Sequence, residues 1–154
     1  MRLEWTMAFD VKKEYKDLYQ PAATPSIIEV PRMRFVAVEG SGDPNEEGGD
    51  YQTALQLLYG VSFTIKMSRK SKDPADHIEG YYDYVVPPLE GLWHMDTADS
   101  EPATIATLDQ HIAESGHRLD FDPANRRLHH EIYLGDPRKS KPENLRTVIR
   151  HPIV

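Results

Sequence analysis

Hydrophobic and polar residues alternate in several stretches of the chain. The alternation is clearest at residues 33–38 and 78–86, where side chains of one kind recur at every second position. This period places them on one face of an extended segment, so both stretches predict strands. Residues 91–97, 127–134 and 145–149 predict three further strands.

Two other stretches have the longer period of a helix. A helix is expected to begin near Asp50, because apolar residues follow at intervals of four, three and four: Ala54, Leu58, Val61 and Ile65. Residues 100–116 predict a second helix, with an apolar stripe of Ile105, Leu108 and Ile112. The order strand, acidic turn, helix and strand thus occurs twice, in residues 35–86 and 92–134. We expect an α+β fold, in which a duplicated unit forms one antiparallel sheet with helices on one face.

Residues 1–25 are polar, carry charges of both signs and end in a segment that contains Pro21 and Pro25. We interpret them as an extended N-terminal arm, anchored by Phe9, Tyr15 and Tyr19, that precedes a domain over residues 26–154. Neither an apolar leader nor an apolar run of about 20 residues is present. The expectation is a cytoplasmic protein without a membrane partner.

The amino-acid composition excludes several kinds of partner and site. The 154 residues include 25 Asp and Glu against 18 Lys and Arg, giving a net charge of −7, which argues against direct nucleic-acid binding. The absence of cysteine excludes disulfides, a thiol nucleophile and thiolate metal sites. His130 and Glu131 begin like a zinc-peptidase motif, but Leu134 stands where the second histidine is required. We therefore expect no metal and no cofactor.

The most informative segment is residues 127–134. Its period of two places His129, Glu131 and Tyr133 on one face, and the other face is expected to lie under the helices. A carboxylate between an imidazole and a phenol is either a solvated sheet face or part of a site. Aromatic side chains elsewhere favour a site for a flat, apolar or cationic molecule, and the candidates for its walls are Trp93, Tyr82, Tyr84 and Tyr59.

Five segments of the chain together suggest a known family: residues 29–47, 57–68, 79–93, 100–116 and 129–153. Through them, about two thirds of the chain resembles the gyrase-inhibitor-like (GyrI-like) small-molecule-binding domains. The resemblance implies two strand–helix–strand–strand modules and an aromatic pocket around a central glutamate, which falls on Glu131. Compared with the family, the chain is shortened after Trp93, so we expect a homodimer in which the partner covers the exposed sheet edge.

Three functions remain open at this point. The resemblance implies a drug or toxin sensor, or a sequestering protein, that binds amphipathic aromatic or cationic molecules. This is the leading hypothesis. The alternative is a hydrolase of electrophilic, cyclopropanoid-type compounds, which the resemblance also implies; in it Glu131 acts on water, and a tyrosine hydroxyl such as that of Tyr133 polarises the leaving group. The third function is binding of a DNA-associated enzyme by acidic mimicry. It is the weakest, because acidic and basic residues are interspersed.

Overall fold

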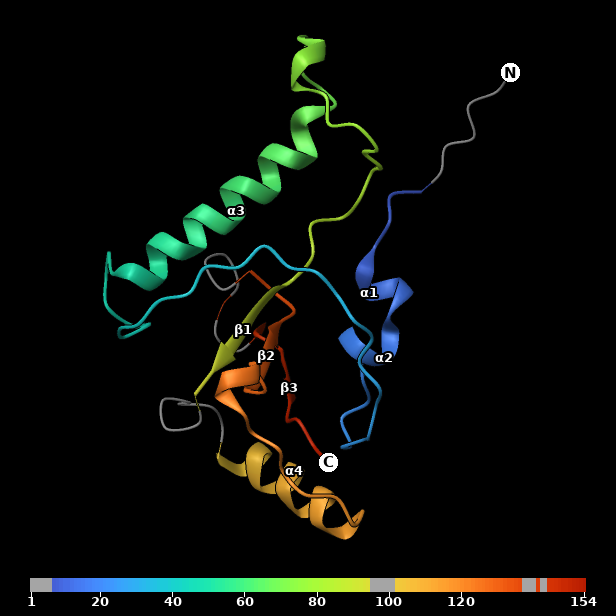
Figure 1. The fold of residues 1–154 in the computed structure, drawn as a ribbon, viewed down its shortest axis with the longest axis vertical. Helices are drawn as coiled ribbons and strands as arrows, with labels where there is room; N and C mark the ends of the chain where they lie inside the picture. Colours follow the sequence, from blue (N-terminus) through green and yellow to red (C-terminus); the bar gives the residue numbers. More distant parts are fainter. Residues whose placement is uncertain (1–6, 95–101, 137–140, 142–143) are drawn as a thin grey trace. The chain divides into compact units, whose positions relative to one another are not determined.

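Helices and a three-stranded antiparallel sheet make up the fold, which confirms the α+β class (Figure 1). The computed structural model describes residues 7–94, 102–136, 141 and 144–154. The chain divides into two units. Unit 1 comprises residues 1–10 and 31–86, and unit 2 comprises residues 11–30 and 87–154. Each unit is described by itself.

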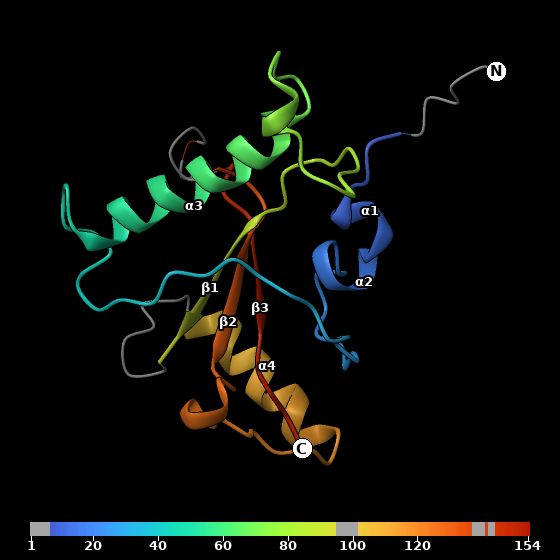
Figure 2. The same ribbon diagram turned by 45° about the horizontal axis from the view of Figure 1, so that its top comes forward.

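Unit 2 contains the sheet. Its strands are β1 (Leu89–Trp93), β2 (His129–Tyr133) and β3 (Thr147–Arg150), with β2 in the centre. Both pairings are antiparallel, and the three strands lie side by side in Figures 1 and 2. Helix α4 (Pro102–Glu114) follows β1 in the chain. Unit 2 is therefore one complete strand–helix–strand–strand module, with strands and helix close to the segments predicted for them.

Two short helices, α1 (Val11–Glu14) and α2 (Lys16–Tyr19), precede the sheet in unit 2, and α2 contacts one face of it. Tyr19 is buried and donates a hydrogen bond of 2.7 Å to Glu90 Oε1 on β1. The other carboxylate oxygen of Glu90 lies 2.8 Å from His130 Nε2. This is also the face of Ile132, which is fully buried. The extended arm that we expected is wrong for residues 11–14 and 16–19, which are helical and bury Val11, Leu18 and Tyr19.

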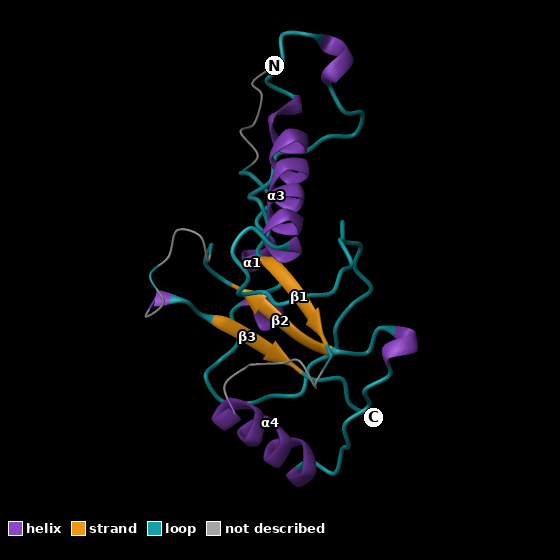
Figure 3. Ribbon diagram, turned by 90° about the vertical axis from the view of Figure 1, so that its left-hand side faces the viewer, coloured by secondary structure: helices purple, strands orange, loops and turns teal. Residues whose placement is uncertain are grey.

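Unit 1 is built around helix α3 (Asp50–Ser68), which begins where the sequence predicts (Figure 3). The strands expected at residues 33–38 and 78–86 are absent from the described structure. In the second stretch only Tyr84 forms a bridge, to Phe9. An alternating pattern is not enough for a strand, because a strand also needs a neighbouring chain to pair with, and residues 33–38 have none in the described part of unit 1.

Two short 3₁₀ helices, η1 (Pro74–Asp76) and η2 (Pro123–Asn125), complete the secondary structure of the described residues. Each begins after an aspartate whose side chain accepts hydrogen bonds from the first turn. No helix among the described residues is long and apolar enough to span a membrane. The shortening expected after Trp93 falls on residues 95–101, which lie outside the described residues, so it stays a prediction.

Candidate functional site

Three residues that the sequence placed on one face of β2 meet a fourth from β1. In the register of the two strands, Trp93 pairs with His129 and Gly91 pairs with Glu131. Paired residues of neighbouring strands share a face. The side chains of His129, Glu131, Tyr133 and Trp93 therefore project from the same side of the sheet, in unit 2.

Glu131 is held at both carboxylate oxygens. His129 Nε2 lies 3.0 Å from Oε1, and the Tyr133 hydroxyl donates a hydrogen bond of 2.5 Å to Oε2. The indole Nε1 of Trp93 in turn donates to the Tyr133 hydroxyl oxygen at 3.1 Å. The Glu131 side chain is only 13% exposed. Burial strengthens these polar contacts, so the carboxylate has a defined position between an imidazole and a phenol.

Gly91 makes room for this arrangement. A Cβ atom at Gly91 would lie 2.5 Å from Trp93 Nε1 and 3.3 Å from the Tyr133 hydroxyl. The first distance is far inside van der Waals contact. Any side chain at this position would therefore push the indole away from Tyr133, and the glycine is what allows Trp93 to fold back over its own strand.

Two further residues extend the site, and sequence reasoning missed both. His151 Nε2 lies 2.9 Å from His129 Nδ1, and its side chain is 1% exposed. On its other side, His151 Nδ1 faces Asp109 Oδ1 of α4 at 3.5 Å. Burial and the neighbouring His129 lower the pKa of His151, with Asp109 acting in the opposite direction. The ring of Phe121 packs edge-on against His151.

The register of the β2–β3 hairpin contains the signal that could have identified His151. His130 pairs with Arg150, so the next position along the two antiparallel chains brings His129 beside His151. Asp109 has no comparable signal, because its position depends on where α4 lies with respect to the end of β3.

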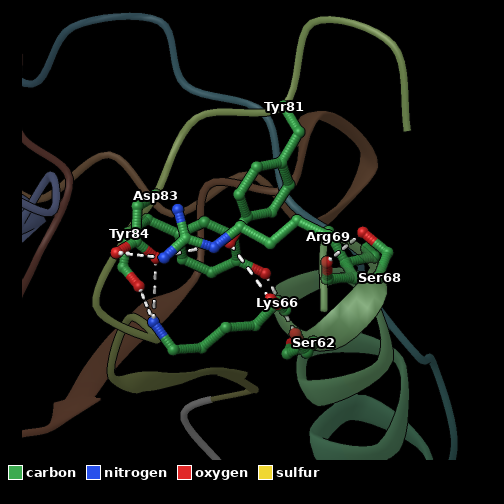
Figure 4. A network of polar contacts seen from close by, with 8 residues as sticks. Ser62, Lys66, Ser68, Arg69, Tyr81, Asp83 and Tyr84 are labelled. Atoms are coloured by element: carbon green, nitrogen blue, oxygen red, sulfur yellow. Dashed lines mark hydrogen bonds and ion pairs between the residues drawn. The ribbon is translucent and has the colours of Figure 1, made fainter. Parts of the chain in front are cut away.

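The other three predicted site residues belong to unit 1. Tyr59 lies half-buried on α3, while Tyr82 is exposed and packs edge-on against Phe9 and Tyr84. The Tyr84 hydroxyl donates a hydrogen bond of 2.9 Å to the carbonyl oxygen of Ser62 (Figure 4). Burial raises the pKa of Tyr84, and Tyr81 and Tyr82 add to this shift. The roles of these tyrosines in ligand binding stay predictions.

Around Tyr84, unit 1 has a polar cluster of its own (Figure 4). Asp83 lies 3.5 Å from Lys66 and 3.2 Å from Arg69, both near the end of α3. Lys66 also donates to the Tyr84 carbonyl oxygen. Although burial opposes it, the charges of Arg69 and Lys66 hold the pKa of Asp83 below its ordinary value. The cluster ties the end of the helix to residues 81–84.

Among the residues that the structure describes, no three His, Cys, Asp or Glu side chains converge in a way that could hold a metal ion. In unit 2 the imidazole nitrogens of His129 are already directed at His151 and Glu131.

Two crystal structures of proteins from Listeria innocua are similar to the chain over nearly its whole length. One, described as a hydrolase, is 32% identical with a TM-score of 0.79, and the match covers 95% of this chain and 100% of that one. The other, described as an uncharacterized conserved protein, is 31% identical with the same TM-score and the same coverage. This chain belongs to their family.

The family relationship includes both units, because each is much larger than the 5% of the chain left unmatched. No family model and no curated protein matches the chain.

Proposed function

We propose that the chain is a GyrI-like domain that hydrolyses electrophilic small molecules of the cyclopropanoid type. The observation that carries the proposal is the Glu131 carboxylate, hydrogen-bonded on one oxygen to His129 and on the other to Tyr133. A carboxylate oriented in this way can take a proton from water. The similarity to a Listeria protein described as a hydrolase supports the same reaction class.

The proposed reaction needs little machinery. Water loses a proton to Glu131 while its oxygen forms a bond to a carbon of the strained ring. The ring C–C bond breaks, and its electron pair moves into a carbonyl group conjugated to the ring. As Glu131 takes the proton, the Tyr133 O–H turns from Glu131 Oε2 to that carbonyl oxygen and donates to it, which stabilises the developing negative charge. The proton on Glu131 then passes to the product.

Trp93 is proposed to set the preference for flat molecules. Its indole lies beside Glu131 and is held there by the hydrogen bond to Tyr133 and by the space above Gly91. An aromatic face next to a carboxylate attracts flat molecules, and cationic ones most strongly.

Turnover with a cyclopropanoid compound tests the proposal. We expect several product molecules per protein molecule, measured by chromatography. Glu131→Gln should lower the rate by about 100-fold or more, because a proton acceptor is lost. Glu79→Gln, an equal change at an exposed position of unit 1, is the matched control. A Glu131→Gln variant as fast as the control contradicts the proposal.

The second candidate is binding without turnover, as in a sensor or a sequestering protein. It is favoured by the position of the Trp93 indole near the largely buried Glu131 carboxylate, with Tyr133 hydrogen-bonded to both. An aromatic ring and a negative charge together suit a cationic aromatic ligand. Glu131→Gln should weaken a cationic dye about tenfold and leave a neutral dye of the same shape unaffected. Equal weakening of both dyes contradicts the electrostatic part. Tight binding of a cyclopropanoid compound without any product favours binding over hydrolysis.

We also propose that the chain forms a homodimer. Large apolar side chains are exposed in unit 1, among them Phe35 at 58% and Phe63 at 60%. In the proposed dimer, these side chains would be covered by the second copy. Light scattering over a micromolar dilution series should show a dimer that Phe35→Glu weakens. A monomer at every concentration contradicts the proposal.

A further inference from the structure

A line of hydrogen-bonding groups leads from Glu131 to the surface of unit 2. At its inner end Glu131 is 13% exposed, and at its outer end Asp109 is 45% exposed. The two imidazoles between them are buried, with His129 fully inaccessible. The successive separations are 3.0 Å from Glu131 to His129, 2.9 Å to His151 and 3.5 Å to Asp109.

The order of donors along this line follows from the chemistry of the groups. When Glu131 is a carboxylate anion it can only accept, so His129 must present N–H at Nε2. With His129 neutral, its Nδ1 is then a lone pair, and His151 Nε2–H donates to it. His151 Nδ1 is left as a lone pair that faces Asp109 Oδ1. The geometry agrees, because neither of these two atoms has a hydrogen bond among the described residues.

The opposite order is equally complete. When Glu131 carries the proton, it donates to His129 Nε2, His129 Nδ1–H donates to His151 Nε2, and His151 Nδ1–H donates to Asp109. The second order holds one proton more than the first, between His151 Nδ1 and Asp109 Oδ1, and the other two shared hydrogens lie on the opposite side. A proton that enters at one end therefore emerges at the other without any heavy atom leaving its place.

We propose that His129, His151 and Asp109 conduct protons between solvent and Glu131. In the inward direction, Asp109 takes a proton from water and passes it to His151 Nδ1. His151 Nε2–H moves to His129 Nδ1, and His129 Nε2–H moves to Glu131 Oε1. One proton enters and one arrives, so the line gains one positive charge and no group is oxidised or reduced.

Burial makes this route important. His129 is fully inaccessible, so its N–H cannot meet water directly. The titratable groups that face the two imidazoles in the described structure are Glu131 from β2 and Asp109 from α4, with Tyr133 on the far oxygen of Glu131. All the partners that the line needs are therefore acids or the imidazoles themselves. His129, His151 and Asp109 act through Glu131 and are positioning residues.

Hydrogen exchange at the His129 imidazole tests the line without any substrate. The Nε2–H of His129 is observed by ¹⁵N NMR, and its exchange with solvent is timed in wild type, Asp109→Asn and His151→Gln. Both substitutions keep hydrogen-bonding groups of similar size but cannot pass a proton on. We expect exchange about tenfold slower or more, since it then requires local opening. The matched control is Glu114→Gln, an exposed charge loss on the same helix.

The direction of the change separates conduction from a structural role. If Asp109 and His151 only packed the site, their substitution would loosen it, and exchange at His129 would accelerate. Exchange that is unchanged or faster in both variants overturns the proposal.

The part that the line plays in catalysis rests on the proposed hydrolysis. With a cyclopropanoid compound, Asp109→Asn should lower kcat, leave KM unchanged and alter the pH profile of the rate. If no compound is turned over while exchange slows as expected, the hydrolysis fails and the proton line stands. If turnover is normal in Asp109→Asn and exchange is unchanged, the line fails and the hydrolysis stands.

Discussion

The two units hold their polar side chains by different means. In unit 2, Trp93, Glu131 and His129 project from paired strands, so the backbone ladder sets the distance between them. In unit 1, Asp83 meets Lys66 and Arg69 across a loop, without a ladder in the described residues. The first arrangement fixes a geometry for chemistry. The second ties a helix end to the chain that follows it.

The polar side chains of the two units also differ in how deeply they are buried. His129 and Glu131 are buried or nearly so, whereas the charged side chains of the unit 1 cluster are 30% to 47% exposed. Water can replace a lost partner at an exposed contact but not at a buried one. Equivalent substitutions should therefore have large effects in unit 2 and small ones in unit 1.

The largest expected effect is in the buried centre of the sheet. Ile132→Ala removes three carbon atoms from a fully buried side chain and should lower the free energy of unfolding by about 3 kcal/mol. Leu57→Ala, on an exposed part of α3, should change it by less than about 0.5 kcal/mol. Urea unfolding of both variants measures this. Equal losses of unfolding free energy in the two variants would contradict the expected difference between unit 2 and unit 1.

A smaller difference is expected between two tyrosine hydroxyls. Tyr133→Phe leaves Trp93 Nε1 and one oxygen of Glu131 without their partner, and should cost about 2 kcal/mol of unfolding free energy. Tyr84→Phe removes one bond to a backbone carbonyl and should cost about 1 kcal/mol or less. Thermal or urea unfolding distinguishes them. A larger loss of unfolding free energy in Tyr84→Phe than in Tyr133→Phe would show that the tyrosine hydroxyl contributes more to stability in unit 1 than in unit 2.

How far the sequence predicts these two units follows from the same contrast. In unit 2, the period of two correctly placed His129, Glu131 and Tyr133 on one face, because alternation within a strand is independent of the rest of the fold. It did not reveal His151. The long connection between β2 and β3 leaves the register of the hairpin open, and a shift of one residue exchanges the faces.

In unit 1, the same alternation of apolar and polar residues predicted strands that the described structure does not contain. Residues 33–38 alternate as regularly as β2, yet they form no strand in the described structure. Alternation states which side chains share a face, whereas pairing depends on a second segment far away in the sequence. The helices were easier to predict, since their hydrogen bonds are local: α3 begins at Asp50, as its apolar spacing indicates.

The pH dependence of stability should differ between the units. Burial and His129 lower the pKa of His151 in the folded protein, so the unfolded chain binds a proton first as the pH falls. The contribution of neutral His151 is complete above its unfolded pKa of about 6.5 and declines as the pH drops toward the lower folded value. His151→Gln should flatten urea midpoints measured between about pH 7 and 5. An unchanged slope would assign the dependence to other groups.

The smallest effect is expected at Asp83. Its folded pKa is lowered by Arg69 and Lys66 against the opposing effect of burial. The stabilisation is present above the ordinary aspartate pKa of about 3.9 and is lost as the pH falls through the lower folded value. Because these charges are partly exposed, Asp83→Asn should shift the urea midpoint only slightly at neutral pH, and the shift should vanish in 1 M salt as screening shortens to about 3 Å. A large shift that persists in salt would mean that Asp83 is as firmly held as Glu131, and that a ladder of paired strands is not needed to fix a carboxylate in this fold.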